Sequence, residues 1–260
     1  MPEPSVAPIV TTLTEGIRQV LGPQLIGVYL IGSAVSGGFD PGVSDVDLIA
    51  VTEPEADGLD LAALESVTSG FVRDRPEWTE RVEVVYVGRA TLRSFRTGGS
   101  LAVVSPGEPF HVRDDAIDWT QTWYQLRETG VAVTGPPAAT LVPAIDWPEF
   151  TQALVNTARA IRARDRGDST PGGRAYGVLT LCRTLTTVRT GEPPTKQHAA
   201  AWVRVRMPEW AWLIDAALRC RASGGRVGFD DPATIEAAWR FEDLVLAQMS
   251  ERQAKDTDSA

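Results

Sequence analysis

Two acidic residues, Asp45 and Asp47, stand at the beginning of an apolar run that ends at Val51. Because side chains alternate across a β-strand, the two carboxylates point to the same face, roughly 6–7 Å apart along the backbone. At that spacing they can share one or two hard divalent cations. Magnesium in proteins is usually held by one or two carboxylates together with substrate phosphates. The pair therefore indicates chemistry on a metal-bound phosphate.

Gly32 and Ser33, which follow the apolar run Val28–Ile31, provide a second feature of the same chemistry. Glycine lets the backbone approach a ligand closely, and free backbone N–H groups in such a turn can bind a phosphate. Ser33 adds a hydroxyl donor. A phosphate-binding turn opposite a carboxylate pair suits phosphoryl or nucleotidyl transfer from a metal-bound triphosphate.

The order of these elements is more informative than the two acids alone. An isolated Asp-x-Asp is more often a solvated strand face or an acidic turn. Here the pair follows an apolar strand, a Gly-Ser turn and a linker of eleven residues, and it leads into a second apolar strand. The whole arrangement is much more specific for a nucleotide site than either part.

The first half of the chain alternates helical and strand patterns. Helices are predicted over 9–21, 59–73 and 116–128, and strands over 25–31, 45–51, 81–87, 101–104 and 131–134. The remainder of 88–115 is predicted to be a loop-rich crossing. This mixture predicts an α+β domain over residues 1–140, with a mixed sheet flanked by helices.

Glu83 is a lone acid inside the third predicted strand, and the pattern alone leaves two interpretations open. It can be an exposed position on one face of the sheet. If instead the third strand pairs beside the second, Glu83 lies near Asp45 and Asp47. It could then bind a metal ion or remove a proton from an attacking hydroxyl.

The second half of the chain reads as helical throughout. Helices are predicted over 146–164, 174–189, 195–206, 208–222 and 233–252. Asp146 is a typical N-cap, with Glu149 at the third helical position. These patterns predict an all-α helical bundle as a second domain, residues 146–252. The boundary is expected between Pro136 and Asp146, and a disordered tail at 253–260.

Composition excludes several classes of protein. A hydrophobic content of 43% and a charged content of 23% are typical of a soluble globular protein. No run approaches the ~18–20 apolar residues of a membrane span. The net charge of −9 argues against a long nucleic-acid partner and is compatible with a small cationic substrate. Met1–Pro4 lacks the basic start of a signal peptide, so we expect a cytoplasmic protein.

The two cysteines, Cys182 and Cys220, lie in apolar helical patterns. Two cysteines make neither a disulfide framework nor a four-ligand zinc site. Buried free thiols are the better interpretation.

Several stretches resemble a known family. GSAVSGGFDPGVSDVDLIAV, VEVVYV, GVAVTGPP and YGVLTLCRTLTTVRTGEPPTKQHAAAW are similar, in the same order, to the streptomycin/spectinomycin adenylyltransferase family of aminoglycoside nucleotidyltransferases. This family lies within the DNA polymerase beta-like nucleotidyltransferase superfamily. The first motif is shared by the whole superfamily, and the helical block around Arg183 and Lys196 is the more discriminating match.

The resemblance implies an N-terminal nucleotidyltransferase domain, a C-terminal helical bundle, and the use of Mg2+ and ATP. Asp45 and Asp47 match the metal-binding aspartates of the family. Glu83 matches the carboxylate proposed as catalytic base, and we expect it to join the metal ligands. Gly32 and Ser33 match the turn that contacts the phosphates.

Three further residues take their expected roles from the resemblance. Ser44 stands just before the first aspartate, as in the family. Arg183 and Lys196 match cationic residues of the helical domain that reach the triphosphate. From the pattern alone, Arg183 would be an exposed helix residue and Lys196 a surface charge.

The departures from the family concern the acceptor site. In the family, acidic residues just before the second C-terminal helix bind the cationic antibiotic. Ser169 and Gly173 stand at the matching positions in this chain. Asp165 and Asp168 lie close by and could substitute. The tryptophan of the family's antibiotic pocket would fall within 108–111, where this chain has none.

Together these observations predict a Mg2+-dependent nucleotidyltransferase that transfers AMP from ATP to a hydroxyl of an aminoglycoside-type antibiotic of the streptomycin or spectinomycin kind, and so confers resistance. One alternative is the same adenylyl transfer to a different hydroxylated small molecule or to a protein hydroxyl. Another is a non-catalytic nucleotide-binding or antitoxin-like module. We expect ATP and a small, hydroxylated, cationic acceptor as partners, no nucleic acid, no membrane, and a monomer.

Overall fold

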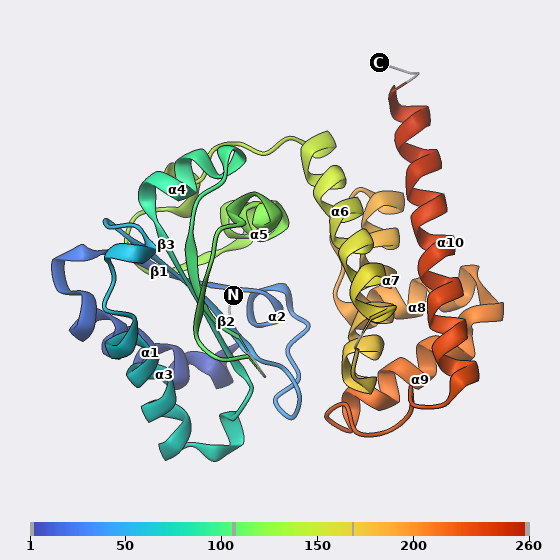
Figure 1. The fold of residues 1–260 in the computed structure, drawn as a ribbon, viewed down its shortest axis with the longest axis horizontal. Helices are drawn as coiled ribbons and strands as arrows, with labels where there is room; N and C mark the ends of the chain where they lie inside the picture. The colour runs from blue at the N-terminus through green and yellow to red at the C-terminus, as the bar shows by residue number, and fades with distance from the viewer. Residues whose placement is uncertain (1–2, 106–107, 168, 258–260) are drawn as a thin grey trace. The chain divides into compact units, whose positions relative to one another are not determined.

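The computed structural model describes residues 3–105, 108–167 and 169–257 (Figure 1). The chain divides into two compact units, Met1–Phe150 and Thr151–Ala260. The domain limits expected from the sequence, 1–140 and 146–252, stay a prediction.

The first unit is built on one six-stranded sheet with the strand order β5-β4-β3-β2-β1-β6. Its strands are β1 (Leu25–Ile31), β2 (Val46–Thr52), β3 (Val82–Gly88), β4 (Leu101–Val104), β5 (His111–Arg113) and β6 (Val131–Thr134). β2 and β3 run parallel, and the other four neighbouring pairs run antiparallel. The sheet is therefore mixed, which confirms the predicted α+β class.

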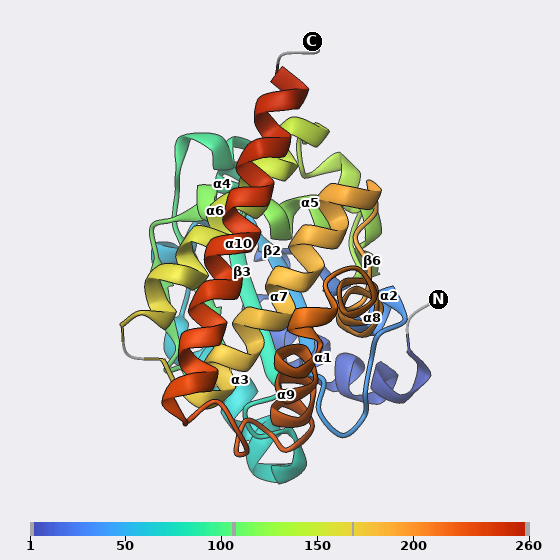
Figure 2. The ribbon, with the colours of Figure 1, turned by 90° about the vertical axis from the view of Figure 1, so that its right-hand side faces the viewer.

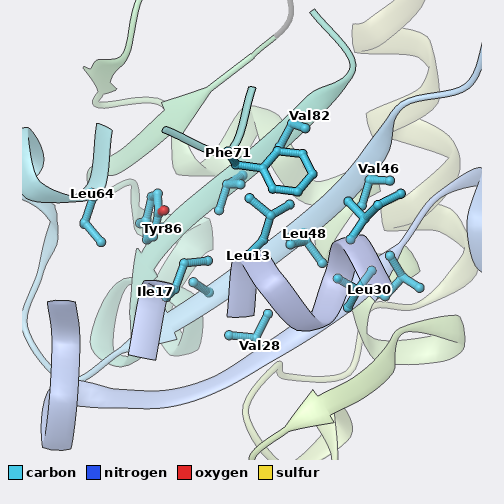
Figure 3. Packing of buried hydrophobic residues seen from close by; sticks show 14 of the residues in the cluster. Leu13, Ile17, Val28, Leu30, Val46, Leu48, Leu64, Phe71, Val82 and Tyr86 are labelled. Carbon is cyan, nitrogen blue, oxygen red and sulfur yellow. The ribbon is translucent and has the colours of Figure 1, made fainter. Parts of the chain in front are cut away.

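Two helices cover one face of this sheet, α1 (Ala7–Leu21) and α3 (Leu61–Asp74) (Figure 1). Figure 3 shows Leu13 and Ile17 of α1 packed against alternate residues of the central strands, among them Leu48. All three side chains are buried. The spacing of four residues places Leu13 and Ile17 on the same side of the helix, as the sequence pattern predicted.

The opposite face of the sheet carries α4 (Arg89–Ser94), which contacts β3, and α5 (Thr120–Thr129), which contacts β1. The fully buried Trp123 of α5 donates its indole N–H to the carbonyl of Ala116, at 2.8 Å. Asp47 and Glu83 lie on this face, because along β2 and β3 they alternate with residues that point to the α1–α3 core.

Short elements are where the structure differs from the sequence expectations. α2 (Ser33–Ser36), α4 and β5 were not predicted, and the helix expected over 116–128 begins as a 3₁₀ turn. Elements of three to six residues do not complete enough periods to be read from a pattern. The 3₁₀ turns are Pro4–Val6, Gly22–Gln24, Ala56–Gly58, Pro76–Trp78, Phe95–Thr97, Ala116–Trp119, Ala138–Thr140 and Pro208–Trp210.

Helices account for the second unit, shown from the side in Figure 2. They are α6 (Trp147–Asp165, which begins in the first unit), α7 (Pro171–Thr190), α8 (Lys196–Arg206), α9 (Ala211–Ala222) and α10 (Pro232–Thr257). α7 packs against α8, α9 and α10. Because it is surrounded in this way, α7 is buried on nearly every side.

Cap residues fix the ends of α7. Thr170 accepts a hydrogen bond from the N–H of Gly173, Pro171 occupies the first turn, and Gly191 ends the helix in the left-handed conformation. Cys182 and Cys220 are buried free thiols, as predicted. α10 continues to Thr257, into the stretch where a disordered tail was expected. Among the described residues, no helix has the length and apolarity that crossing a membrane requires.

Candidate active site

Asp47 and Glu83 lie side by side on neighbouring strands. In the parallel pair β2–β3, Asp47 is in register with Glu83, and on its other side Asp47 is in register with Ile31 of β1. Neighbouring strands are ~4.8 Å apart, so the two acids project from adjacent positions of one face. Asp45 immediately precedes β2. The structure therefore places Asp47 and Glu83 next to each other, with Asp45 two residues before Asp47, and all three acids are partly exposed.

The Gly32 turn lies directly against Asp47. Gly32 has a φ of 71°, in the left-handed region, and a Cβ placed on it would collide with Oδ2 of Asp47. Glycine is needed here both for the backbone conformation and for the space. Ser33 follows at the start of α2, and its buried hydroxyl has no hydrogen-bond partner among the described residues.

Ser105 is a contact of Glu83 that sequence reasoning missed. Its hydroxyl donates to Oε2 of Glu83 at 3.2 Å. β3 and β4 are antiparallel, with Val84 opposite Val104, so Ser105 follows β4 next to Glu83. The predicted strand over 101–104 could have indicated this contact. If that strand pairs antiparallel with the third predicted strand, Ser105 lies beside Glu83.

Ser44 is buried, with a side chain that is 1% exposed. Its carbonyl accepts hydrogen bonds from the guanidinium of Arg81, which comes just before β3. Burial lowers the pKa of Arg81 below its ordinary value, while the negative charges of Asp45, Asp40 and Glu77 act in the opposite direction. Arg81 therefore remains cationic beside Asp45.

The three acids offer only carboxylate oxygens, the kind of ligand that magnesium prefers. Among the described residues, no group of three or more His, Cys, Asp or Glu side chains is placed to hold a metal ion. Asp45, Asp47 and Glu83 therefore do not form a closed cage. Magnesium does not require one, because one or two carboxylates usually hold it together with water and substrate phosphates.

Two further observations make the site fit a cation that arrives with a phosphate. The Asp47 carboxylate lies against the glycine turn, and the hydroxyl of Ser33 is buried without a partner among the residues that the structure describes. The turn can supply donors to a phosphate, and the acids can supply ligands to its cation. The residues present thus fit magnesium bound with a nucleotide, and their assignment stays a prediction.

Arg183 and Lys196 belong to the second unit. Within 177–188 of α7, Arg183 is the residue left partly exposed. Lys196 is the first residue of α8, and its Nζ lies 4.5 Å from the ring centre of Tyr176. Such a cation–π contact holds the ammonium group over the ring. Tyr176 and Arg183 are seven residues apart and so lie on one side of α7.

The region of the predicted acceptor departures is also in the second unit. Asp165 is fully buried, and the hydroxyl of Ser169 donates to its Oδ1 at 2.9 Å. Because it is buried, Asp165 is not available at the surface of this unit to contact a ligand. Gly173 lies in the first turn of α7. Asp168 falls outside the described residues.

A cleft of about 270 Å³ lies in the first unit. It is lined by Thr68, Val72, Glu80, Val82, Val104, Ser105 and Glu108. Ser105 is the residue it shares with the surroundings of Glu83, and most of the other lining residues come from α3 and the face of the sheet that α3 covers. The cleft is therefore next to the candidate site and does not contain its aspartates.

Comparison with known proteins gives consistent matches. A family model described as the C-terminal domain of aminoglycoside adenylyltransferase matches residues 140–246. Spectinomycin 9-adenylyltransferase of Campylobacter jejuni is 26% identical over 205 residues, which cover 73% of this chain and 75% of that protein. Aminoglycoside (3'') (9) adenylyltransferase of Klebsiella pneumoniae is 28% identical over 222 residues, which cover 80% and 83%.

A solved structure has the same fold. The crystal structure of spectinomycin adenyltransferase AAD(9) from Enterococcus faecialis, with ATP and spectinomycin, matches with a TM-score of 0.70. The sequences are 19% identical, and the match covers 90% of this chain and 98% of that one.

Proposed function

Because this chain is a nucleotidyltransferase of the aminoglycoside adenylyltransferase family, we propose that it transfers AMP from ATP, with Mg2+, to a hydroxyl of an aminoglycoside-type antibiotic and so confers resistance. One observation carries the proposal. The parallel pairing of β2 and β3 sets Glu83 beside Asp47, and Asp47 lies against the glycine turn that precedes the buried hydroxyl of Ser33.

Each residue has a chemical role in this proposal. Asp45 and Asp47 would hold Mg2+, which when bound offsets negative charge on the triphosphate. The hydroxyl of Ser33 and the backbone of the Gly32 turn donate hydrogen bonds to phosphate oxygens. These groups fix the nucleotide before any bond changes, which is the main contribution a protein makes to phosphoryl-group transfer.

The transfer itself needs one base. The hydroxyl oxygen of the acceptor bonds to the α-phosphorus of ATP while the bond from that phosphorus to the bridging oxygen breaks, and pyrophosphate leaves. Glu83 accepts the hydroxyl proton. Positive charge stabilises the leaving pyrophosphate, and Arg183 and Lys196 are the residues proposed to supply it.

The proposed acceptor is an aminoglycoside of the streptomycin or spectinomycin type, and the net charge of −9 suits a cationic substrate. One observation favours a second candidate. Ser169 and Gly173 stand where the family resemblance calls for acids, and the nearby Asp165 is fully buried. A different hydroxylated small molecule, modified by the same chemistry, is therefore the alternative acceptor.

The test is to incubate the protein with ATP, Mg2+ and either streptomycin or spectinomycin, and then to measure the mass of the antibiotic. A gain equal to one adenylyl group on either compound is expected. No gain on any member of a wider aminoglycoside panel would exclude this substrate class and leave the alternative acceptor.

A variant ties the activity to the site. Asp47→Asn should abolish adenylyl transfer while thermal unfolding shows a folded protein, because the amide cannot replace a charged metal ligand. Asp57→Asn, at an exposed position of the same unit, is the matched control and should retain full activity. Normal turnover by Asp47→Asn would refute the role given to this carboxylate.

A further inference from the structure

The residues that precede Asp45 form a closed turn. The N–H groups of Val43 and Ser44 donate to the carbonyl of Asp40, at 3.0 and 2.7 Å. In return the N–H of Asp40 donates to the hydroxyl of Ser44, at 2.9 Å, and Oδ1 of Asp40 accepts from the N–H of Gly42, at 3.0 Å. These hydrogen bonds give the turn Asp40–Ser44 a defined shape.

Arg81 holds this turn from the start of β3. Its Nε and Nη2 both donate to the carbonyl of Ser44, at 3.0 and 2.5 Å, and Nη2 also donates to the carbonyl of Pro41, at 2.8 Å. The guanidinium stacks on Trp78, with 4.4 Å from its central carbon to the ring centre. One side chain therefore connects two carbonyls of the turn to the strand that carries Glu83.

The same residue anchors the chain on the other side of Asp45. The N–H of Val46 donates to the backbone carbonyl of Arg81, at 2.9 Å. Asp45 thus lies between two neighbours that are both fixed to Arg81, Ser44 through the guanidinium and Val46 through the backbone. The backbone of Asp45 cannot move far without breaking one of these hydrogen bonds.

We propose that Arg81 is a positioning residue that sets the place of Asp45 relative to Glu83 for the metal-bound nucleotide. The inference rests on the proposed function. Arg81 acts through the turn, because its N–H groups donate hydrogen bonds to backbone carbonyl oxygens of the protein. Misplacing a ligand by about 1 Å can lower the rate up to a hundredfold. A loosened turn should therefore weaken the binding of the metal-bound nucleotide.

The geometry explains why arginine is needed. A guanidinium presents several donors in a rigid, planar fork, so it can bind two carbonyls and stack on an indole ring together. An ammonium group carries the same charge at a single point. Arg81→Lys therefore keeps the positive charge near Asp45 and removes the planar fork of hydrogen-bond donors.

The experiment compares wild-type protein, Arg81→Ala, Arg81→Lys and Arg75→Ala. Arg75 is the matched control because its guanidinium also stacks on an aromatic ring, that of Phe71 at 4.8 Å. Hydrogen exchange of the backbone amides of Val43 and Ser44, both of which donate to the carbonyl of Asp40, reports the turn without reference to activity. Calorimetric titration with Mg2+ and a non-hydrolysable ATP analogue reports nucleotide binding. Circular dichroism confirms that each variant is folded.

In both Arg81 variants, the exchange of these two amides should be at least tenfold faster than in the wild type. The affinity for the nucleotide analogue should fall about tenfold or more, and the KM for the acceptor should stay unchanged. Arg75→Ala should match the wild type. If Arg81→Lys also matches the wild type, charge alone suffices and the positioning role is overturned.

Two other results would also overturn the inference. Unchanged exchange in Arg81→Ala would mean that Arg81 does not hold the turn. Faster exchange with unchanged nucleotide affinity would mean that the turn does not place a nucleotide ligand. Failure of the proposed function is distinguishable from both, because the wild-type protein would then bind no nucleotide while the exchange of Val43 and Ser44 still responded to the Arg81 variants.

Discussion

Glu242 of α10 is a carboxylic acid buried inside the helical unit. Glu242 is 0% exposed, and its carboxyl group lies against that of Asp165, which is also fully buried. Burial is the main cause that raises the pKa of Glu242 from 4.5 to about 8. The hydrogen bond with Asp165 and the negative charge of Asp165 contribute to this rise, and the positive charge of Arg166 opposes it. Glu242 therefore carries a proton in the folded protein at neutral pH.

The stability consequence follows from proton linkage. Below pH 4.5 the carboxyl is protonated whether the chain is folded or unfolded, so the free energy of unfolding carries no penalty from this group. As the pH rises toward 8, the unfolded chain releases the proton and the folded chain keeps it, which favours unfolding. Each pH unit of this interval costs about 1.4 kcal/mol, so the loss between about pH 5 and about pH 7.5 is about 3 kcal/mol.

Glu242→Gln removes this loss, because the amide has the shape of the protonated acid and cannot ionise. Denaturant unfolding of the variant and of wild-type protein should give similar free energies at about pH 5. At about pH 7.5 the variant should be more stable by about 3 kcal/mol. Glu236→Gln is the matched control: Glu236 is exposed on the same helix in an ion pair with Arg240, and its substitution should change stability little at either pH.

One result would refute the reasoning about Glu242. If the difference in unfolding free energy between Glu242→Gln and wild-type protein were the same at both pH values, the folded protein would not hold the extra proton. A fall in the stability of the variant at both pH values would instead indicate that the site tolerates the carboxylate and not the amide.

Two further substitutions test the candidate site directly. Gly32→Ala should weaken nucleotide binding by at least tenfold in calorimetry, because the added Cβ collides with Asp47. Gly37→Ala is its control, since Gly37 has a similar left-handed φ of 76° with nothing close to its Cβ position, and equal losses in both variants would mean that backbone strain alone is responsible. Ser105→Ala should lower kcat about tenfold, with little change in the KM for ATP, because it removes the hydrogen bond that orients Glu83, and Ser105→Thr should restore kcat. An equal loss in the Thr variant would show that the hydroxyl does not act through Glu83.

The parts of the fold that could be predicted are those with long, regular patterns. The spacing of Leu13 and Ile17 predicted α1, and the apolar runs of β1 and β2 predicted the centre of the sheet, because burial of one face imposes a fixed period. α2 and β5 were missed since they are too short to show a period. β5 is held by its pairing with β4, which a local pattern does not record.

The candidate site was predictable to the extent that it lies on patterned strands. Asp47 and Glu83 could be placed on strands, but their adjacency needed the pairing of β2 with β3, which the sequence left open. Arg81 and Ser105 were missed because their roles depend on contacts between segments distant in the chain. No spacing rule connects Arg81 to Ser44, and only the folded backbone brings the guanidinium to that carbonyl.

The parallel pairing of β2 with β3 affects which parts of this fold can change in length. A parallel pair requires a crossover, and here the chain passes through α3 on the face of the sheet away from the acids. The distance between Asp47 and Glu83 in space is set by strand pairing alone, so their separation along the chain is free to change. Insertions in the connection between β2 and α3 can therefore remodel the surface of the protein while the two carboxylates stay neighbours.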